Sequence, residues 1–170
     1  MAEPASYSRE PMPNDAVLRE HLIKLLEGGQ AHATLDGAVK GFPLDQVGVR
    51  PKGLPYSAWE LLEHMRIAQE DILRFSISGE HESPKWPEGY WPTSPAPEKA
   101  SHWARSLKAV RHDLAEFQAL VRDTKRDLHR KFPWGDGQTL LREALLIADH
   151  NSYHIGQLVL VRRLLGVWPK

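Results

Sequence analysis

Residues 149–157, with the sequence DHNSYHIGQ, lie in a run from residue 140 to residue 165 in which apolar side chains recur at helical spacing. Residues four apart on a helix lie one above the other, so His150 and His154 point the same way. Apolar neighbours lie close to the same face, so we expect both imidazoles to face the core. Two imidazoles at this spacing can bind one metal ion. The stretch therefore predicts a bundle helix that contributes to a metal site.

Three other segments show the spacing of amphipathic helices: residues 14–27, 57–78 and 103–121. Asn14 is a favourable N-cap for the first of them, and Gly28 follows its last turn. Ser57 and Glu60 are three residues apart and fit a capping box at the start of the second. A shorter helix is predicted over residues 34–40, and no segment alternates as a strand would. The sequence thus predicts an all-α fold of four long helices with one or two short ones.

The length of the chain fits one domain with its own core, and we assign residues 14–168 to that domain and residues 1–13 to a polar N-terminal tail. Lys and Arg total 22, as do Asp and Glu, so the formal charge is zero and does not favour nucleic acid or an anionic membrane as a partner. The tail lacks the apolar core of a signal peptide, and the most apolar stretch is too short to span a bilayer. We therefore expect a cytoplasmic protein.

The chain contains nine histidines, so a pair four residues apart is roughly an even bet by chance. A third histidine adds weight. His64 lies between Leu61 and Ala68 in angle, so it too is expected on the inner face of its helix. One ion shared by two helices would explain three inward-facing imidazoles at once. Three separate, hydrogen-bonded core histidines are the alternative.

The other histidines carry less weight. His21 is expected in the core or at its boundary, and His32 in a capping or surface role. The rest lie in loops or among charged residues and are expected to be solvated: His81, His102, His112 and His129. Glu143 shares the stripe of His150 but lies two turns away, too far to bind the same ion readily.

Residues 79–97 form a long connection that contains five prolines together with Trp86, Tyr90 and Trp91. Loops of this length are uncommon in a compact domain and often carry function. The aromatic side chains suggest that the loop packs over another part of the molecule. A lid over the metal site and a surface loop held by stacked rings are both consistent with the sequence.

Two runs of sequence resemble the DinB-like superfamily, which includes YfiT-type metal-dependent hydrolases and relatives of bacillithiol- and mycothiol-dependent transferases. These runs are GLPYSAWELLEHMRIAQEDIL around His64 and PWGDGQTLLREALLIADHNSYHIGQLVLVRRLLG around His150 and His154. The resemblance implies an antiparallel four-helix bundle of the up-down-down-up type with a long crossover, and a homodimer. It also implies that His64, His150 and His154 bind a divalent metal.

The resemblance does not carry a single reaction, because the family includes thiol-dependent transferases and many members without an established activity. Three neutral imidazoles leave a coordination position open, as catalytic zinc sites do. A zinc or nickel ion is expected, with manganese or iron as alternatives. An ion in such a site can lower the pKa of water or of a thiol. Because the chain has no cysteine, a thiol would have to come from a small cofactor.

The sequence therefore favours a metal-dependent enzyme that transfers a low-molecular-weight thiol or hydrolyses a small substrate. The alternative is a non-enzymatic, dimeric helical bundle with a structural or vestigial metal site. Beyond the three histidines, the candidates for a catalytic role are Gln157, Asp149 and Tyr153, for which contacts between helices are an equally good explanation. The substrate is not indicated, and no direct binding to nucleic acid or to a membrane is expected.

Overall fold

The computed structural model describes residues 15–169, and these residues form five α-helices, one short 3-10 helix and no β-strand. The predicted all-α class is confirmed. The elements are α1 (Asp15–Glu27), α2 (Leu35–Val39), α3 (Ala58–Ile77), η1 (Glu88–Tyr90), α4 (Ala100–Arg122) and α5 (Leu140–Leu164). The predicted N-cap Asn14 and the tail over residues 1–13 lie outside the described residues.

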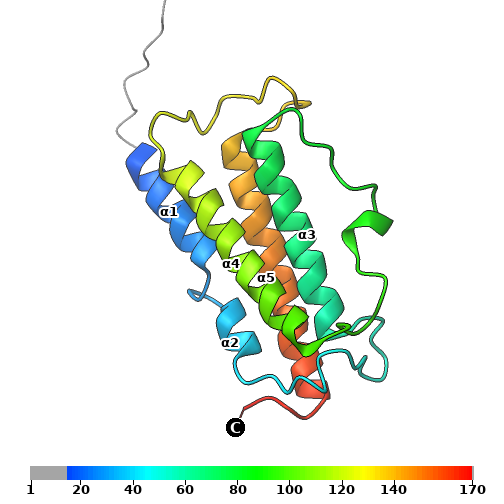
Figure 1. Ribbon diagram of the computed structural model, residues 1–170. Coiled ribbons are helices and arrows are strands. Elements are labelled where there is room, and N and C mark those ends of the chain that lie inside the picture. The colour runs from blue at the N-terminus through cyan, green and yellow to red at the C-terminus, as the bar shows by residue number, and fades with distance from the viewer. Residues whose placement is uncertain (1–14, 170) are drawn as a thin grey trace, which may run out of the picture.

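The four long helices lie side by side as a bundle, with α2 near one end (Figure 1). Helix α3 packs against α4 and α5, and α1 packs against the same two helices. The short helix α2 packs against α5. The side chain of Thr34 caps α2 by accepting a hydrogen bond from the backbone N–H of Gly37, as expected for a helix that starts at this position.

The apolar core has two halves along the bundle. One half is near α2 and includes Trp59 and Trp103, and the other is near α1 and includes Phe117 and Leu128. On α5 the second half ends at Ala148 and the first resumes at Ile155. His150 and His154 lie between these positions, so they occupy the level at which the two halves of the core meet.

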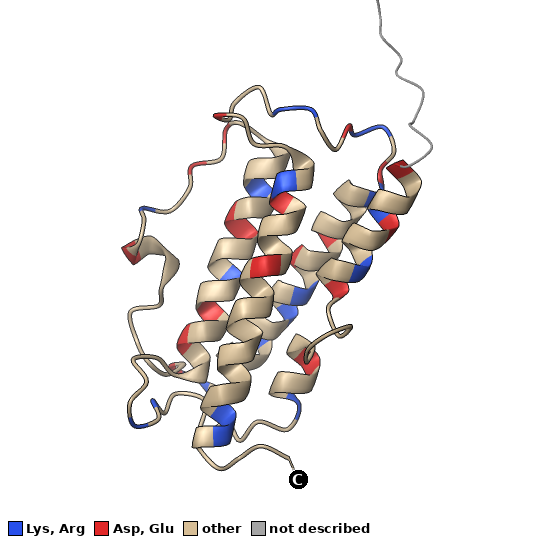
Figure 2. Cartoon of the chain, turned by 180° about the vertical axis from the view of Figure 1, so that it is seen from behind, with Lys and Arg blue, Asp and Glu red and all other residues tan. Residues whose placement is uncertain are grey.

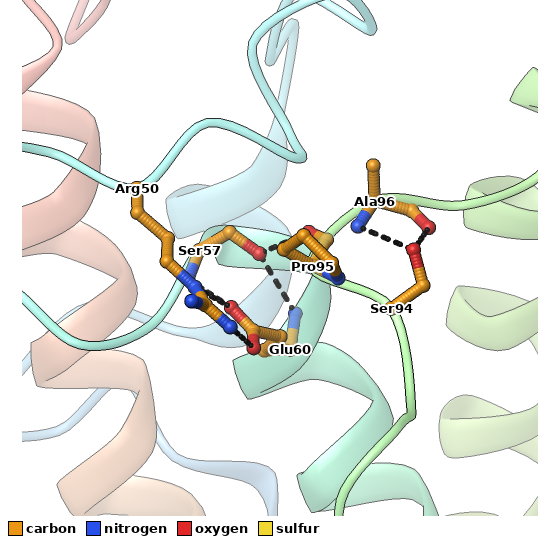
Figure 3. Close-up of polar contacts among 6 residues, drawn as sticks. All are labelled: Arg50, Ser57, Glu60, Ser94, Pro95 and Ala96. Atoms are coloured by element: carbon orange, nitrogen blue, oxygen red, sulfur yellow. Dashed lines mark hydrogen bonds and ion pairs between the residues drawn. The ribbon is translucent and has the colours of Figure 1, made fainter.

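A capping box starts α3, as the sequence predicts (Figure 3). The Ser57 hydroxyl accepts from the backbone N–H of Glu60 at 3.2 Å, and the Glu60 carboxylate accepts from the backbone N–H of Ser57 at 2.8 Å. Arg50 pairs with the same carboxylate. The Ser57 hydroxyl also donates to the carbonyl of Pro95 at 2.5 Å. The long connection leaves α3 at its C-terminus, and this bond holds the later part of the connection, at Pro95, against the N-terminus of α3.

That connection joins α3 to α4 and runs along the outside of α3, with η1 at its middle (Figure 1). Contacts between η1 and α3 place this part of the loop against the helix that carries His64. The loop therefore covers one long side of the bundle at the level of the histidines.

Acidic and basic residues are interspersed along the helices and loops in the view of Figure 2. Within the described residues, no helix combines the length and the apolar character that crossing a membrane requires.

Candidate metal centre

The structure brings His64, His150 and His154 together, with one ring nitrogen from each residue within 4.8 Å of the others. His64 lies on α3, and the other two lie one turn apart on α5. The side chains of His64 and His154 are buried, and His150 is half-buried. Three imidazoles from two neighbouring helices thus converge on one point, an arrangement compatible with a metal site.

The far side of the His64 ring is held by the loop. Its Nδ1 atom lies 2.9 Å from the carbonyl oxygen of Tyr90. A carbonyl can only accept a hydrogen bond, so the proton of the neutral ring is on Nδ1 and the lone pair is on Nε2. The Trp91 ring stacks on the His64 ring with centroids 4.0 Å apart and the planes 2° from parallel. Tyr90 and Trp91 therefore fix the tautomer and the plane of the His64 ring.

His154 is oriented in a similar way by a residue of its own helix. Its Nδ1 atom lies 2.7 Å from Oε1 of Gln157, which accepts the hydrogen bond and leaves the lone pair on Nε2. A ring nitrogen that is hydrogen-bonded on its far side is the usual arrangement for a histidine that binds a metal. The third ring, His150, approaches directly: its Nε2 atom is 3.0 Å from Nε2 of His64.

Burial keeps all three imidazoles neutral at neutral pH. Burial lowers the pKa of His64, with the hydrogen bond to Tyr90 acting in the opposite direction. Burial, followed by the neighbouring His154 and His64, lowers the pKa of His150 to about 4. Burial also lowers the pKa of His154. A divalent ion needs unprotonated ring nitrogens, so the chemistry of this donor set fits a metal better than it fits three protonated histidines.

The other predicted candidates lie on α5 at different distances from the group. Gln157 is half-buried and contacts His154, as described above. Tyr153 is 64% exposed, and its ring meets the His154 ring edge-on with centroids 5.0 Å apart. Asp149 is exposed on the outer side of the helix. Of the three, Gln157 is the residue that the structure joins by a hydrogen bond to the histidine group.

A polar network along α3 was missed by the sequence analysis. The Tyr90 hydroxyl donates to Oδ2 of Asp71 at 2.6 Å, and Nε2 of His81 lies 2.7 Å from Oδ1 of Asp71. Burial, followed by Asp71, raises the pKa of Tyr90 to about 12, so the hydroxyl keeps its proton. The prediction that His81 is solvated is wrong, because the loop returns it to α3, where it is half-buried. The spacing of seven residues between His64 and Asp71 on one helix was the available signal.

A second buried chain of hydrogen bonds reaches α5 from α4. Nε2 of Gln69 donates to the carbonyl of Val110 at 2.7 Å, and Nδ2 of Asn151 donates to Oε1 of Gln69 at 2.8 Å. The remaining amide oxygen of Asn151 is buried without a hydrogen-bond partner in the described part of the chain. Asn151 also lines a cavity of about 50 Å³. This relay fixes the backbone and side-chain position next to His150.

Two further clusters of polar residues lie elsewhere. A cavity of about 170 Å³ is lined on its polar side by Asp71, Gln138 and Glu143, two turns along the helices from the histidines. A group formed by His112, Asp113 and Glu116 lies on one side of α4. The carboxylate of Glu116 is 3.6 Å from Arg74, so an arginine already offsets part of its charge.

A sequence model of the DinB superfamily matches residues 29–158 of the chain, a span that contains all three histidines. No curated protein and no solved structure matches the chain.

Proposed function

The chain belongs to the DinB superfamily, and on this premise we propose that it binds one divalent metal ion through His64, His150 and His154. The observation that carries the proposal is the 3.0 Å approach of two Nε2 atoms, together with acceptors on the far side of His64 and His154. These acceptors turn the lone pairs of two rings toward the third. The lowered pKa of each histidine leaves its ring unprotonated and ready for an ion at neutral pH.

For the ion we propose zinc or nickel, with manganese or iron as the alternatives. A donor set made of imidazoles alone suits zinc and nickel, whereas manganese prefers sites richer in carboxylates. The buried carboxylate of α5, Glu143, lies two turns from His150 and pairs with Arg142 at 2.8 Å, so it does not compete for the role of a ligand.

We propose further that the metal site serves an enzyme of the thiol S-transferase or hydrolase type. A bound divalent ion would supply Lewis-acid chemistry that lowers the pKa of water or of a thiol. The residues of the protein hold the three imidazoles in place, orient two of them through Tyr90 and Gln157, and limit the access of water with the Trp91 ring. A thiol substrate would be a small molecule from solution, since the chain contains no cysteine.

The second candidate is a non-enzymatic bundle in which an ion joins α3 to α5. One observation favours it: the Trp91 ring stacks on His64 and also meets the His154 ring with centroids 6.4 Å apart. Trp91 therefore covers one side of the group, where a substrate could otherwise approach. Under this proposal the ion would add stability, and removing it would loosen the contact between the two helices.

The remaining parts of the proposal concern architecture. The order of colours along the helices in Figure 1 supports an up-down-down-up bundle with residues 78–99 as its long crossover. We assign residues 14–168 to a single domain. Exposed apolar side chains along α5 support a homodimer: Leu145, Tyr153, Leu160 and Leu164. The mixed charges in Figure 2 support a small molecule rather than nucleic acid as the ligand, and we place the protein in the cytoplasm.

Elemental analysis of protein purified without a metal-affinity tag would test the metal site. We expect about one divalent ion per chain in the wild type and little in His150→Ala, because two imidazoles bind far more weakly than three. His129→Ala is the matched control, since it removes an exposed histidine that belongs to neither histidine-containing cluster. An ion content that is the same in His150→Ala and in the wild type would overturn the proposed ligands.

An activity screen would then separate the two candidates. Low-molecular-weight thiols are offered with a generic electrophile, and esters and amides are offered as hydrolase substrates, to metal-loaded protein and to His150→Ala. Turnover by the loaded wild type alone would support the enzyme. Failure of every substrate class, together with a melting temperature that rises when metal is added, would favour the structural role.

A further inference from the structure

Tyr90 is bound at both ends to α3. Its backbone carbonyl accepts from Nδ1 of His64 at 2.9 Å, and its side-chain hydroxyl donates to Asp71 at 2.6 Å. Asp71 follows His64 by seven residues, so the two lie about 10.5 Å apart along the helix at a rise of 1.5 Å per residue. A single loop residue therefore spans two turns of α3 and ends on the ring of a proposed metal ligand.

The Asp71 end of this span is itself held in place. The Asp71 side chain is 12% exposed, and its second oxygen lies 2.7 Å from Nε2 of His81, whose side chain is 22% exposed. Two residues of the loop, His81 and Tyr90, thus meet on one carboxylate. The Trp86 ring packs edge-on against Tyr90 with centroids 5.4 Å apart. The tyrosine side chain has few torsions and its ring contacts Trp86, so a displacement at Asp71 reaches its backbone.

The position of the Tyr90 backbone matters because its carbonyl contacts the His64 ring. In a neutral imidazole one nitrogen carries the proton and the other carries the lone pair. The Tyr90 carbonyl accepts the proton of Nδ1, and this contact leaves Nε2 free to face His150 at 3.0 Å. Trp91, the next residue, stacks on the ring and sets its plane. The position of the Tyr90 backbone therefore determines both the tautomer and the orientation of His64.

We infer that Asp71 is a positioning residue for metal binding, which acts through Tyr90 to hold His64 in the Nδ1–H tautomer. This inference rests on the proposed metal site and extends it to a carboxylate two turns away that does not touch the ion. Asp71 anchors the hydroxyl, the hydroxyl fixes the backbone of Tyr90, and the carbonyl fixes the ring. The pair is expected to act as one unit, so losing both members costs no more affinity than losing one.

Variants of the full chain test the inference: Tyr90→Phe, Asp71→Ala, Asp71→Asn and the double variant Tyr90→Phe with Asp71→Ala. Tyr56→Phe is the matched control, because Tyr56 is another half-buried tyrosine, placed just before α3. The first readout is the tautomer of His64 in metal-free protein, read from long-range ¹H–¹⁵N spectra and assigned with His64→Ala. The second is zinc affinity, measured by competition with a chromophoric chelator.

We expect the Nδ1–H tautomer in the wild type and in Tyr56→Phe, and a mixture of tautomers in Tyr90→Phe and Asp71→Ala. Zinc affinity should fall about tenfold in each of these two, at the low end of the range for lost partners of ligand histidines. Asp71→Asn keeps one hydrogen-bond acceptor, so its zinc affinity should lie between that of the wild type and that of Tyr90→Phe and Asp71→Ala. The double variant should equal the single ones, which a merely structural pair of independent contacts would not do.

An unchanged tautomer with unchanged zinc affinity in both Tyr90→Phe and Asp71→Ala would overturn the inference. The circular dichroism of each variant is compared with that of the wild type, and Tyr90→Phe, which removes a single oxygen atom, tests the relay with the smallest change to packing. If the wild type binds none of zinc, nickel, manganese and iron, the proposed metal site fails. The tautomer of His64 in the metal-free protein then decides the positioning relay by itself.

Discussion

The Nε2 atoms of His64 and His150 lie 3.0 Å apart, although 86 residues separate them in the chain. The two rings come from α3 and α5, which pack against each other in the bundle. Because the proton of His64 is on Nδ1, its Nε2 lone pair faces this short gap. Two ring nitrogens at this distance are best accommodated by a shared proton or by a shared cation. With the third ring of His154 beside them, a cation can use all three lone pairs, whereas a single proton can use only two.

Gln157 should tune the affinity for the ion through His154. Gln157→Leu removes the acceptor that lies 2.7 Å from Nδ1 of His154, so we expect metal affinity to fall about tenfold. Gln157→Glu places a carboxylate at the same position. A carboxylate makes the His154 ring a stronger electron-pair donor to the ion, so this variant should keep or raise the metal affinity. Chelator competition on both variants measures the effect. Equal affinities in the two variants would mean that Gln157 does not act through His154.

Trp91→Ala should open the histidine group to solvent. The ring stacks on His64 at 4.0 Å, so its loss removes the cover on that side. We expect faster loss of the ion to a chelator, and a loss of about 2 kcal/mol in the free energy of unfolding, below the ~3–5 kcal/mol of a fully buried tryptophan. The matched control is Trp134→Ala, a partly exposed tryptophan that stacks on Phe132 instead. The same rate of ion loss in both variants would show that Trp91 does not shield the site.

The helices could be predicted because their signals are local. The capping box of Ser57 and Glu60 and the apolar spacing of α5 depend on residues within one or two turns of each other. The same periodicity placed each of the three histidines on an inward face of its helix, but their convergence on one point was only one of two alternatives. The periodicity could not predict that the Nε2 atoms of His64 and His150 lie 3.0 Å apart, because this distance depends on the register of α3 against α5.

The contacts of the loop could not be predicted in this way. Its sequence identified Trp86, Tyr90 and Trp91 as candidates for packing. A loop with five prolines, however, has no periodicity that assigns an aromatic ring to one face. In the structure Trp91 covers His64, whereas Trp86 is 68% exposed. The bond from Tyr90 to Asp71 depends on the loop lying against α3, so it appears only when the fold is known.

Ser57→Ala should destabilise the protein more than the loss of an ordinary helix cap does. The hydroxyl accepts from the backbone of Glu60 and also donates to the carbonyl of Pro95. The cap contributes about 1 kcal/mol, and leaving a carbonyl without its donor costs about 1 kcal/mol more. Thr139→Ala is the matched control, because Thr139 caps α5 through one hydrogen bond to Arg142. Urea unfolding should therefore give a larger loss for Ser57→Ala, and an equal loss would exclude a role for the bond to Pro95.

Glu143 should make the protein less stable as the pH rises. Its carboxyl group is 2% exposed, and burial raises its pKa from the ordinary value of 4.5, with Arg142 opposing the shift and Asp71 adding to it. The folded state therefore binds more protons than the unfolded state between pH 4.5 and the raised pKa. Since stability falls with pH wherever the folded state holds more protons, this group lowers the free energy of unfolding as the pH rises through that window. The penalty is absent below pH 4.5 and complete above the raised pKa.

Glu143→Gln removes this titration and keeps an oxygen that can accept from Arg142. Relative to the wild type, the variant should gain stability as the pH rises from 4.5 through the raised pKa of Glu143. Urea unfolding at several pH values measures the difference between the two proteins, which cancels the titration of the histidines that they share. Glu27→Gln, at an exposed position of α1, is the control and should show no such trend. A difference that stays constant or shrinks with rising pH would mean that Arg142 fully offsets the burial of Glu143, and that the carboxylate is stable in its charged form.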